Sequence, residues 1–199
     1  MKIILSSNNP SKIRQIKAVF SSSPIQVLSL ADAGISGEAI EDGNTLEANA
    51  LKKAYFARGG LSEPEWVMSD DSGIFITALD GEPGVHSAYW GGAGKATEQI
   101  TEYCLERMRT QTDRSAIFRT VVAAISPDGT EHFFKGEVRG KLLESPRCKP
   151  QPKMPYSPLF VPDGENLCWA EMTIEHENRI SHRGKAFRLA REFLEKAAG

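Results

Sequence analysis

The feature that most constrains the fold is the opening of the chain, where residues 1–30 contain a predicted strand, helix and second strand. Lys2–Ser6 is a predicted buried strand, because three consecutive apolar residues are followed by polar turn residues. Ser11 is a residue type that caps helices, and the segment from Ser11 to Phe20 has apolar residues at helical spacing. Ile25–Leu30 is the next expected strand. This order favours an α/β chain built around a sheet.

The rest of the chain continues the mixture of helices and strands. The predicted helices are Thr45–Arg58, Thr97–Arg109 and Gly184–Ala197, and the predicted strands are Trp66–Ser69, Ile117–Ser126 and Glu131–Lys141. Pro127-Asp128-Gly129 supplies the turn of a hairpin between the last two strands. Ser145–Pro158 contains five prolines and no glycine, which indicates a stiff extended loop. A hairpin beside helix-linked strands predicts a mixed sheet, with a site where polar loops leave the strand ends.

Length and charge limit the classes of protein that fit. A chain of 199 residues without a clear linker or internal repeat predicts one domain over 1–199. The net charge of -2, with acids and bases mixed, offers no basic stripe for nucleic acid. No apolar run is long enough for a membrane span. Cys104, Cys148 and Cys168 show neither a disulfide framework nor a zinc spacing, so a reducing cytoplasm is expected.

Two segments carry candidate phosphate-binding groups. Leu5–Lys12 places hydroxyl and amide residues between a strand and a helix, where backbone N–H groups, the helix dipole and Lys12 would favour a phosphate. An ordinary capped helix with a solvated lysine explains the same pattern. Gly91–Thr97 resembles a phosphate loop, but its spacing fails the Walker pattern, and a surface turn is the better interpretation.

Several acids could hold a metal ion. These acids are Glu38, Glu41, Asp42, Glu47, Asp70 and Asp71. Magnesium prefers one or two carboxylates together with phosphate oxygens, and acids from separate segments can supply that set. A solvated helix face explains most of the earlier acids. Asp70-Asp71 is the stronger candidate, because an apolar run delivers both acids to a predicted strand end.

A last polar group, Ser181-His182-Arg183, precedes the C-terminal helix. Histidine and arginine can contact base edges or phosphate, although a polar helix start has the same composition.

The order of the motifs along the chain is more specific than any one of them. The chain resembles the inosine triphosphate pyrophosphatase family in Ser7–Lys12, Glu41–Ala50 with Lys53-Ala54, Asp70–Ile74, Gly81–Ala88, Pro158–Phe160 and Ser181–Ala186. The resemblance covers nearly the whole chain, and Asn8 stands where the family's opening motif has glycine.

The resemblance implies an elongated α/β fold with a central mixed sheet, flanking helices and two lobes with a cleft between them. It also implies a homodimer and Mg²⁺-dependent hydrolysis of nucleoside triphosphates to monophosphate and pyrophosphate. Carried over to this sequence, Asn9 and Lys12 contact the triphosphate, and His182 and Arg183 contact the purine base. Glu41 and Asp71 hold magnesium, and Asp71 or Asp70 acts as the general base. The other expected substrate contacts are Ser7, Ser72, Met154, Tyr156, Ser157 and Glu177.

The departures from the family lie on the substrate side. Met154 replaces an aromatic residue expected to stack on the base, and Ser157 replaces an acid. Glu177 replaces a lysine five residues before the histidine of Ser-His-Arg, and Tyr89 replaces an arginine. The retained acids predict an active pyrophosphohydrolase with an altered base pocket. A catalytically weak nucleotide-binding or scaffold homologue is the alternative. An unrelated phosphatase is disfavoured because no Cys or Ser nucleophile motif is evident.

Overall fold

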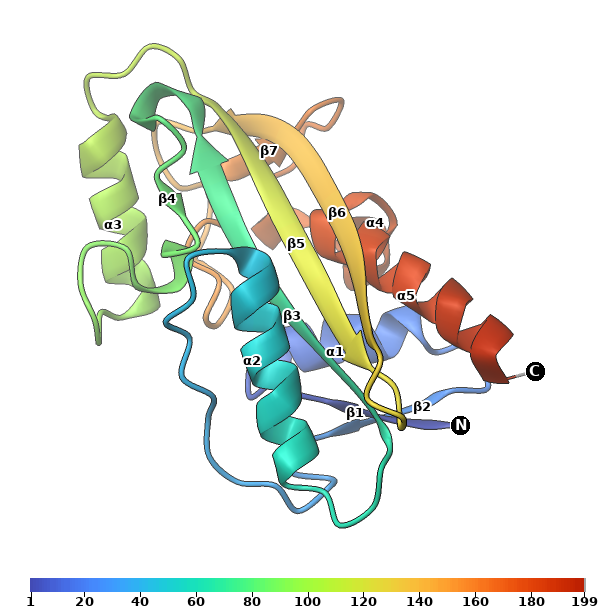
Figure 1. Cartoon of the computed structure of the whole chain (residues 1–199). Coiled ribbons are helices and arrows are strands. Elements are labelled where there is room, and N and C mark those ends of the chain that lie inside the picture. Colours follow the sequence, from blue (N-terminus) through green and yellow to red (C-terminus); the bar gives the residue numbers. More distant parts are fainter. Residues whose placement is uncertain (199) are drawn as a thin grey trace.

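The computed structural model describes residues 1–198, which form a seven-stranded mixed sheet with helices on both faces (Figure 1). The strands follow the order β2-β1-β3-β5-β6-β7, and β4 pairs with the far end of β3. β1 runs parallel to β2 and β3, whereas β3, β5, β6 and β7 are successively antiparallel. The predicted α/β class with a mixed sheet is confirmed.

The element bounds are as follows. The strands are β1 (Lys2–Leu5), β2 (Gln26–Ser29), β3 (Trp66–Ile76), β4 (Pro83–Gly84), β5 (Ser115–Ile125), β6 (Glu131–Leu142) and β7 (Phe160–Pro162). The helices are α1 (Pro10–Val19), α2 (Leu46–Gly59), α3 (Thr97–Met108), α4 (Ile174–Ile180) and α5 (His182–Ala198). Short 3₁₀ turns lie at Thr77–Leu79, Ser87–Tyr89 and Trp169–Glu171.

The helices bury three apolar clusters against the sheet. α1 and α5 pack on one face over Ile3, Leu5 and Met68, and α2 covers the opposite face over Ile4 and Val67. A third cluster lies at the far end of β3 and β5, beneath α3. The division of one domain into two lobes stays a prediction. Within residues 1–198, no helix is both long and apolar enough to cross a membrane.

The predicted boundaries of α1 and β3 are wrong. The N-cap of α1 is Asn9 rather than Ser11, because the Asn9 side chain accepts hydrogen bonds from the backbone N–H groups of Ser11 and Lys12. β3 does not end at Ser69 but continues to Ile76, since β5 pairs with it from Val67 to Ile76. Asp70 and Asp71 therefore lie in the middle of a strand.

The proline-rich loop is the third correction. Its second half turns tightly instead of running extended, with a bridge between Gln151 and Met154. The Ser157 hydroxyl holds the turn, because it donates to the Met154 carbonyl at 2.7 Å and accepts from the Gln151 N–H at 2.9 Å. β7 and α4 were not predicted, and α5 begins at His182 rather than Gly184. The glycines of Gly91–Thr97 adopt positive φ in a surface turn, as predicted.

The sheet has a gap beside β3, because β1 is shorter than β3. β1 stops at Leu5, opposite Met68, while β3 runs on past it. Within the described chain, no strand pairs with Ser69–Gly73 on the β1 side until β4 reaches Ile74. Side chains from both faces can reach this stretch of β3, and the candidate site lies here.

Candidate active site

A cavity of about 440 Å³ lies at this gap. All thirteen predicted site residues line it: Ser7, Asn9, Lys12, Glu41, Asp70, Asp71, Ser72, Met154, Tyr156, Ser157, Glu177, His182 and Arg183. The structure thus brings together residues from the N-terminal loop, β3, the proline-rich loop, α4 and α5.

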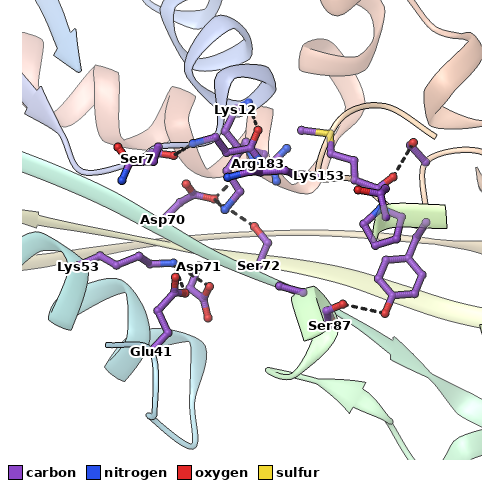
Figure 2. Close-up of a pocket in the computed structure, with 18 of the residues that line it drawn as sticks. Ser7, Lys12, Glu41, Lys53, Asp70, Asp71, Ser72, Ser87, Lys153 and Arg183 are labelled. Atoms are coloured by element: carbon purple, nitrogen blue, oxygen red, sulfur yellow. Dashed lines mark hydrogen bonds and ion pairs between the residues drawn. The ribbon is translucent and has the colours of Figure 1, made fainter. Parts of the chain in front are cut away.

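The Asp70 carboxylate lies among cationic side chains on one side of β3 (Figure 2). Its Oδ2 lies 3.0 Å from the Lys12 ammonium and 3.5 Å from Arg183 Nε, and it accepts a 3.2 Å hydrogen bond from the Ser72 hydroxyl. Burial alone would raise the pKa of the Asp70 carboxyl, but Lys12, Arg183 and Lys53 outweigh it and hold that pKa below its ordinary value. Asp70 is therefore a permanent anion that positions cations and is a poor acceptor of protons.

Asp71 makes a separate group on the other side of the strand, because successive strand residues point to opposite faces. Its Oδ1 lies 2.9 Å from the Lys53 ammonium, which also contacts Glu41 Oε2 at 2.7 Å. Asn49 donates to Asp71 Oδ2 at 3.3 Å. Burial raises the pKa of the Asp71 carboxyl, although Lys53 opposes the shift. Asp71 is accordingly the more basic carboxylate of the two.

Sequence reasoning missed Lys53 as a site residue. Lys53 is one helical turn after Asn49 on α2, and both side chains reach Asp71. The i, i+4 spacing of an amide and a lysine in the second family motif was an available signal.

The start of α1 borders the cationic end of the cavity. The Asn9 side chain caps the helix, accepting at 3.0 Å from Ser11 N–H and at 3.3 Å from Lys12 N–H. The Ser7 hydroxyl accepts a 3.3 Å bond from Asn9 N–H, which holds the loop against the helix. Burial lowers the pKa of the Lys12 ammonium, and repulsion from Lys53 and Arg183 adds to this effect. Five cationic residues line the cavity beside this helix N-terminus, and their charge favours a polyanionic ligand: Lys12, Lys53, Lys95, Lys153 and Arg183.

Aromatic side chains form another part of the cavity lining, which we call the aromatic end. The His182 ring stacks on Phe118 with centroids 4.6 Å apart and planes at 18°, and Trp169 lies 6.2 Å from His182. The Tyr156 hydroxyl donates to the Ser87 carbonyl at 2.9 Å, and burial raises the pKa of this phenol. Burial also holds the pKa of His182 well below its ordinary value, with Arg183 reinforcing the shift, so the imidazole is neutral at neutral pH. An apolar, flat-walled pocket of this kind suits a planar ring.

Phe118 and Trp169 were also missed. Phe118 follows the alternation of β5 and could have been placed on one face of that strand, but the pairing that brings it to the cavity is visible only in three dimensions. Trp169 lies on a 3₁₀ turn outside any predicted element and carried no signal.

The residues that depart from the family pattern differ in where they lie relative to the cavity. Glu177 is 3% exposed and lines the cavity, and burial raises the pKa of its carboxyl. Met154 is half-buried at the aromatic end. Tyr89 is 38% exposed, does not line the cavity, and makes a 2.8 Å hydrogen bond with His86 Nδ1. Tyr89 therefore lies beside the cavity lining rather than in it, and partial burial, together with the charges of Asp71 and Glu41, raises the pKa of its hydroxyl.

Residues 3–193 match the pattern of the Ham1 family. The chain belongs to this family. The resemblance drawn from the ordered motifs is thereby confirmed. Relatives include the dITP/XTP pyrophosphatase of Geobacter sulfurreducens, which is 36% identical over 195 residues, covering 97% of this chain and 96% of the relative.

Solved structures of Ham1 relatives share the fold. The Ham1 protein of Staphylococcus aureus superposes with a TM-score of 0.82 at 32% identity, covering 99% of this chain and 100% of that one. The nucleoside-triphosphatase / dITP/XTP pyrophosphatase of Mycobacterium abscessus superposes with a TM-score of 0.72 at 32% identity, covering 96% and 98% of the two chains.

Proposed function

We propose that this protein hydrolyses purine nucleoside triphosphates of the aberrant type to nucleoside monophosphate and pyrophosphate. The observation that carries the proposal is one cavity lined by partly buried cations, aromatic rings and the β3 carboxylates. The cations suit a triphosphate in charge, and the aromatic rings suit a purine base in shape. The names of the full-length relatives support the same reaction.

The carboxylates of Glu41 and Asp71 fit a magnesium ion. Both already converge on one positive group, the Lys53 ammonium, at 2.7 and 2.9 Å. In the described residues, no three His, Cys, Asp or Glu side chains form a complete metal cage. Two carboxylates completed by substrate oxygens and waters are the set that Mg²⁺ prefers. Mg²⁺ held there would neutralise phosphate charge and stabilise the charge that develops during reaction.

The proposed roles of the other site residues follow from the side of β3 on which each of them lies. Lys12 binds the triphosphate, and Asp70 holds Lys12 and Arg183 in place for it. Water attacks the α-phosphorus, the bond from that phosphorus to the bridging oxygen breaks, and pyrophosphate leaves with the electron pair. Asp71 accepts the proton of the water, because Asp70 is held as an anion by Lys12 and Arg183 and is a poor acceptor of protons.

At the base end, His182 and Phe118 form a flat wall for the purine, and Met154 and Tyr156 lie on the proline-rich loop that borders it. We assign Ser7, Asn9 and Ser72 to the triphosphate end, since they lie beside Lys12 and Asp70. A homodimer and a two-lobed single domain belong to the same proposal, on the family resemblance.

The deciding experiment is pyrophosphate release with Mg²⁺ across inosine, xanthosine, guanosine and deoxyuridine triphosphates. Pyrophosphate and monophosphate in equal amounts support the proposal. Release of inorganic phosphate would instead indicate a phosphatase, and binding without turnover by the folded protein would support the nucleotide-binding alternative. Sedimentation at micromolar protein tests the dimer.

A further inference from the structure

The cationic residues that line the cavity differ in whether a carboxylate neutralises them. Three of them lie between 2.7 and 3.5 Å from a carboxylate oxygen: Lys12, Lys53 and Arg183. Within residues 1–198, the other two, Lys95 and Lys153, form no ion pair. A paired cation attracts a polyanion less than an unpaired one, because the neighbouring carboxylate repels the same ligand.

Lys153 is the less restrained of the two unpaired lysines. The Lys95 ammonium lies 4.8 Å from the centre of the Tyr103 ring, so it has an aromatic partner. In the part of the chain that the structure describes, the exposed Lys153 side chain has neither a hydrogen bond nor such a ring contact. A solvated surface lysine would look the same. Lys153 differs from one because it lines the cavity and because its backbone conformation is unfavourable for lysine.

The unfavourable conformation comes from a tight turn in the proline-rich loop. The turn spans Gln151–Met154 and is closed by the Met154 N–H, which donates to the Gln151 carbonyl at 2.9 Å. Pro152 is its second residue, and Lys153, with a φ of 58°, is its third. Proline followed by a positive φ is typical of a type II turn, which favours glycine at the third position. Lysine is strained there, since its Cβ crowds the backbone.

The rest of the loop holds this turn in place. The Thr101 hydroxyl donates to the Pro155 carbonyl at 2.6 Å, and the Ala170 N–H donates to the Ser157 carbonyl at 2.9 Å. A strained residue that its surroundings enforce is typical of a ligand-binding site. The fold therefore fixes the point at which the Lys153 side chain leaves the loop, and leaves its ammonium without a partner.

We propose that Lys153 is a substrate-binding residue whose ammonium pairs with the phosphate groups of the nucleotide. Figure 2 shows Lys153 on the side of β3 where Lys12 and Arg183 lie. An ammonium offers a full charge and three donors, which match phosphate oxygens, whereas a neutral purine base offers acceptors without charge. This inference rests on the proposed function, because it adds a residue to the same cavity.

Calorimetric titration of the full chain with inosine triphosphate and with inorganic tripolyphosphate tests the inference. EDTA prevents turnover during the titration. Lys153→Gln keeps the length of the side chain and removes its charge, so it should weaken binding of both probes about 3- to 10-fold at low salt. The loss should shrink as salt is raised, because salt screens an exposed ion pair. Lys149→Gln, an exposed lysine on the same loop that does not line the cavity, should leave both affinities unchanged.

Two glycine variants separate binding from folding. Lys153→Gly and Lys149→Gly both put glycine at an exposed site of one loop, so both increase the freedom of the unfolded chain alike. Only Lys153→Gly relieves a positive φ. Its melting temperature should therefore be about 2–4 °C above that of Lys149→Gly. Lys153→Gly should nevertheless bind tripolyphosphate as weakly as Lys153→Gln.

Four results would overturn the inference. The first is a Lys153→Gln variant that binds inosine triphosphate as tightly as wild type, and the second is a loss that does not shrink with salt. The third is wild-type protein that does not bind tripolyphosphate, or a loss seen only with inosine triphosphate, which would place the ammonium on the base or ribose. The fourth is a Lys153→Gly variant no more stable than Lys149→Gly. Failure of the proposed function has a different signature, namely no pyrophosphate from any triphosphate with Mg²⁺ while Lys153→Gln still weakens binding.

Discussion

Asp70 and Asp71 are neighbours in the sequence, yet their carboxylates bind cations on opposite sides of β3 (Figure 2). Asp70 contacts Lys12 from α1, and Asp71 contacts Lys53 from α2. The alternation of a strand separates them, and the early end of β1 leaves both accessible from one cavity. An adjacent pair of acids thus serves two purposes: one orders the cations, and the other is available for chemistry.

Asp71→Asn should reduce turnover at least about a hundredfold with the fold unchanged, since a carboxamide can neither accept the proton nor hold magnesium as well. Steady-state pyrophosphate release measures the effect. Asp80→Asn, at an exposed turn, is the matched control. Near-normal turnover of the Asp71 variant would remove this residue from the mechanism.

Asp70→Asn should destabilise the protein by about 3–5 kcal/mol at pH 7, because Lys12 and Arg183 lose the anion that they share in a buried site. The folded-state pKa of Asp70 lies below its ordinary value of 3.8, so its contribution is complete above that pH and is lost as pH falls toward the lowered pKa. Urea unfolding should show the gap between wild type and variant narrowing only below about pH 4.

The exposed Asp163→Asn should change stability by less than about 0.5 kcal/mol in the same assay. An Asp70 variant as stable as this control would show that the Lys12–Asp70–Arg183 group contributes nothing to folding.

His182 should make the protein less stable as the solution is acidified from pH 7 to pH 5. Its imidazole is held neutral in the folded state by burial, whereas the unfolded chain takes up a proton near the ordinary pKa of 6.5. The slope from one such proton reaches about 1.4 kcal/mol per pH unit. Urea unfolding of wild type and His182→Gln at pH 5, 6 and 7 should show a shallower dependence in the variant. Parallel curves would show that His182 takes up a proton to the same extent in the folded and the unfolded state, which would contradict the prediction.

Asn9→Ala should lower the free energy of unfolding by about 1 kcal/mol, because the cap bonds to Ser11 and Lys12 are lost. Asn9→Ser restores a good cap and should recover most of that stability. If Asn9 also contacts the triphosphate, KM stays raised in both variants. A normal KM in the serine variant would limit Asn9 to capping.

Much of the site could be predicted from the sequence. The family resemblance, carried over residue by residue, named thirteen residues that all line one cavity, because a motif keeps its residue types at fixed positions in a short segment. Lys53, Phe118 and Trp169 were missed, since each reaches the cavity through pairing or packing between segments far apart in the chain. Tyr89 replaces an arginine of the family pattern but does not line the pocket, and only the three-dimensional structure shows this.

The sequence by itself determined the mixed α/β class, the motif order and the residue types available for phosphate and metal, because hydrophobic periodicity and residue chemistry are properties of short segments. Tertiary structure alone decided that β3 continues through the two aspartates, that each aspartate faces a different cation, and that Glu177 is buried with an unpartnered oxygen. The physical reason is that strand length, side-chain burial and pKa depend on what packs against a residue from elsewhere in the chain. β5 extended β3, and the packing of α4 among the cavity-lining segments removed Glu177 from water.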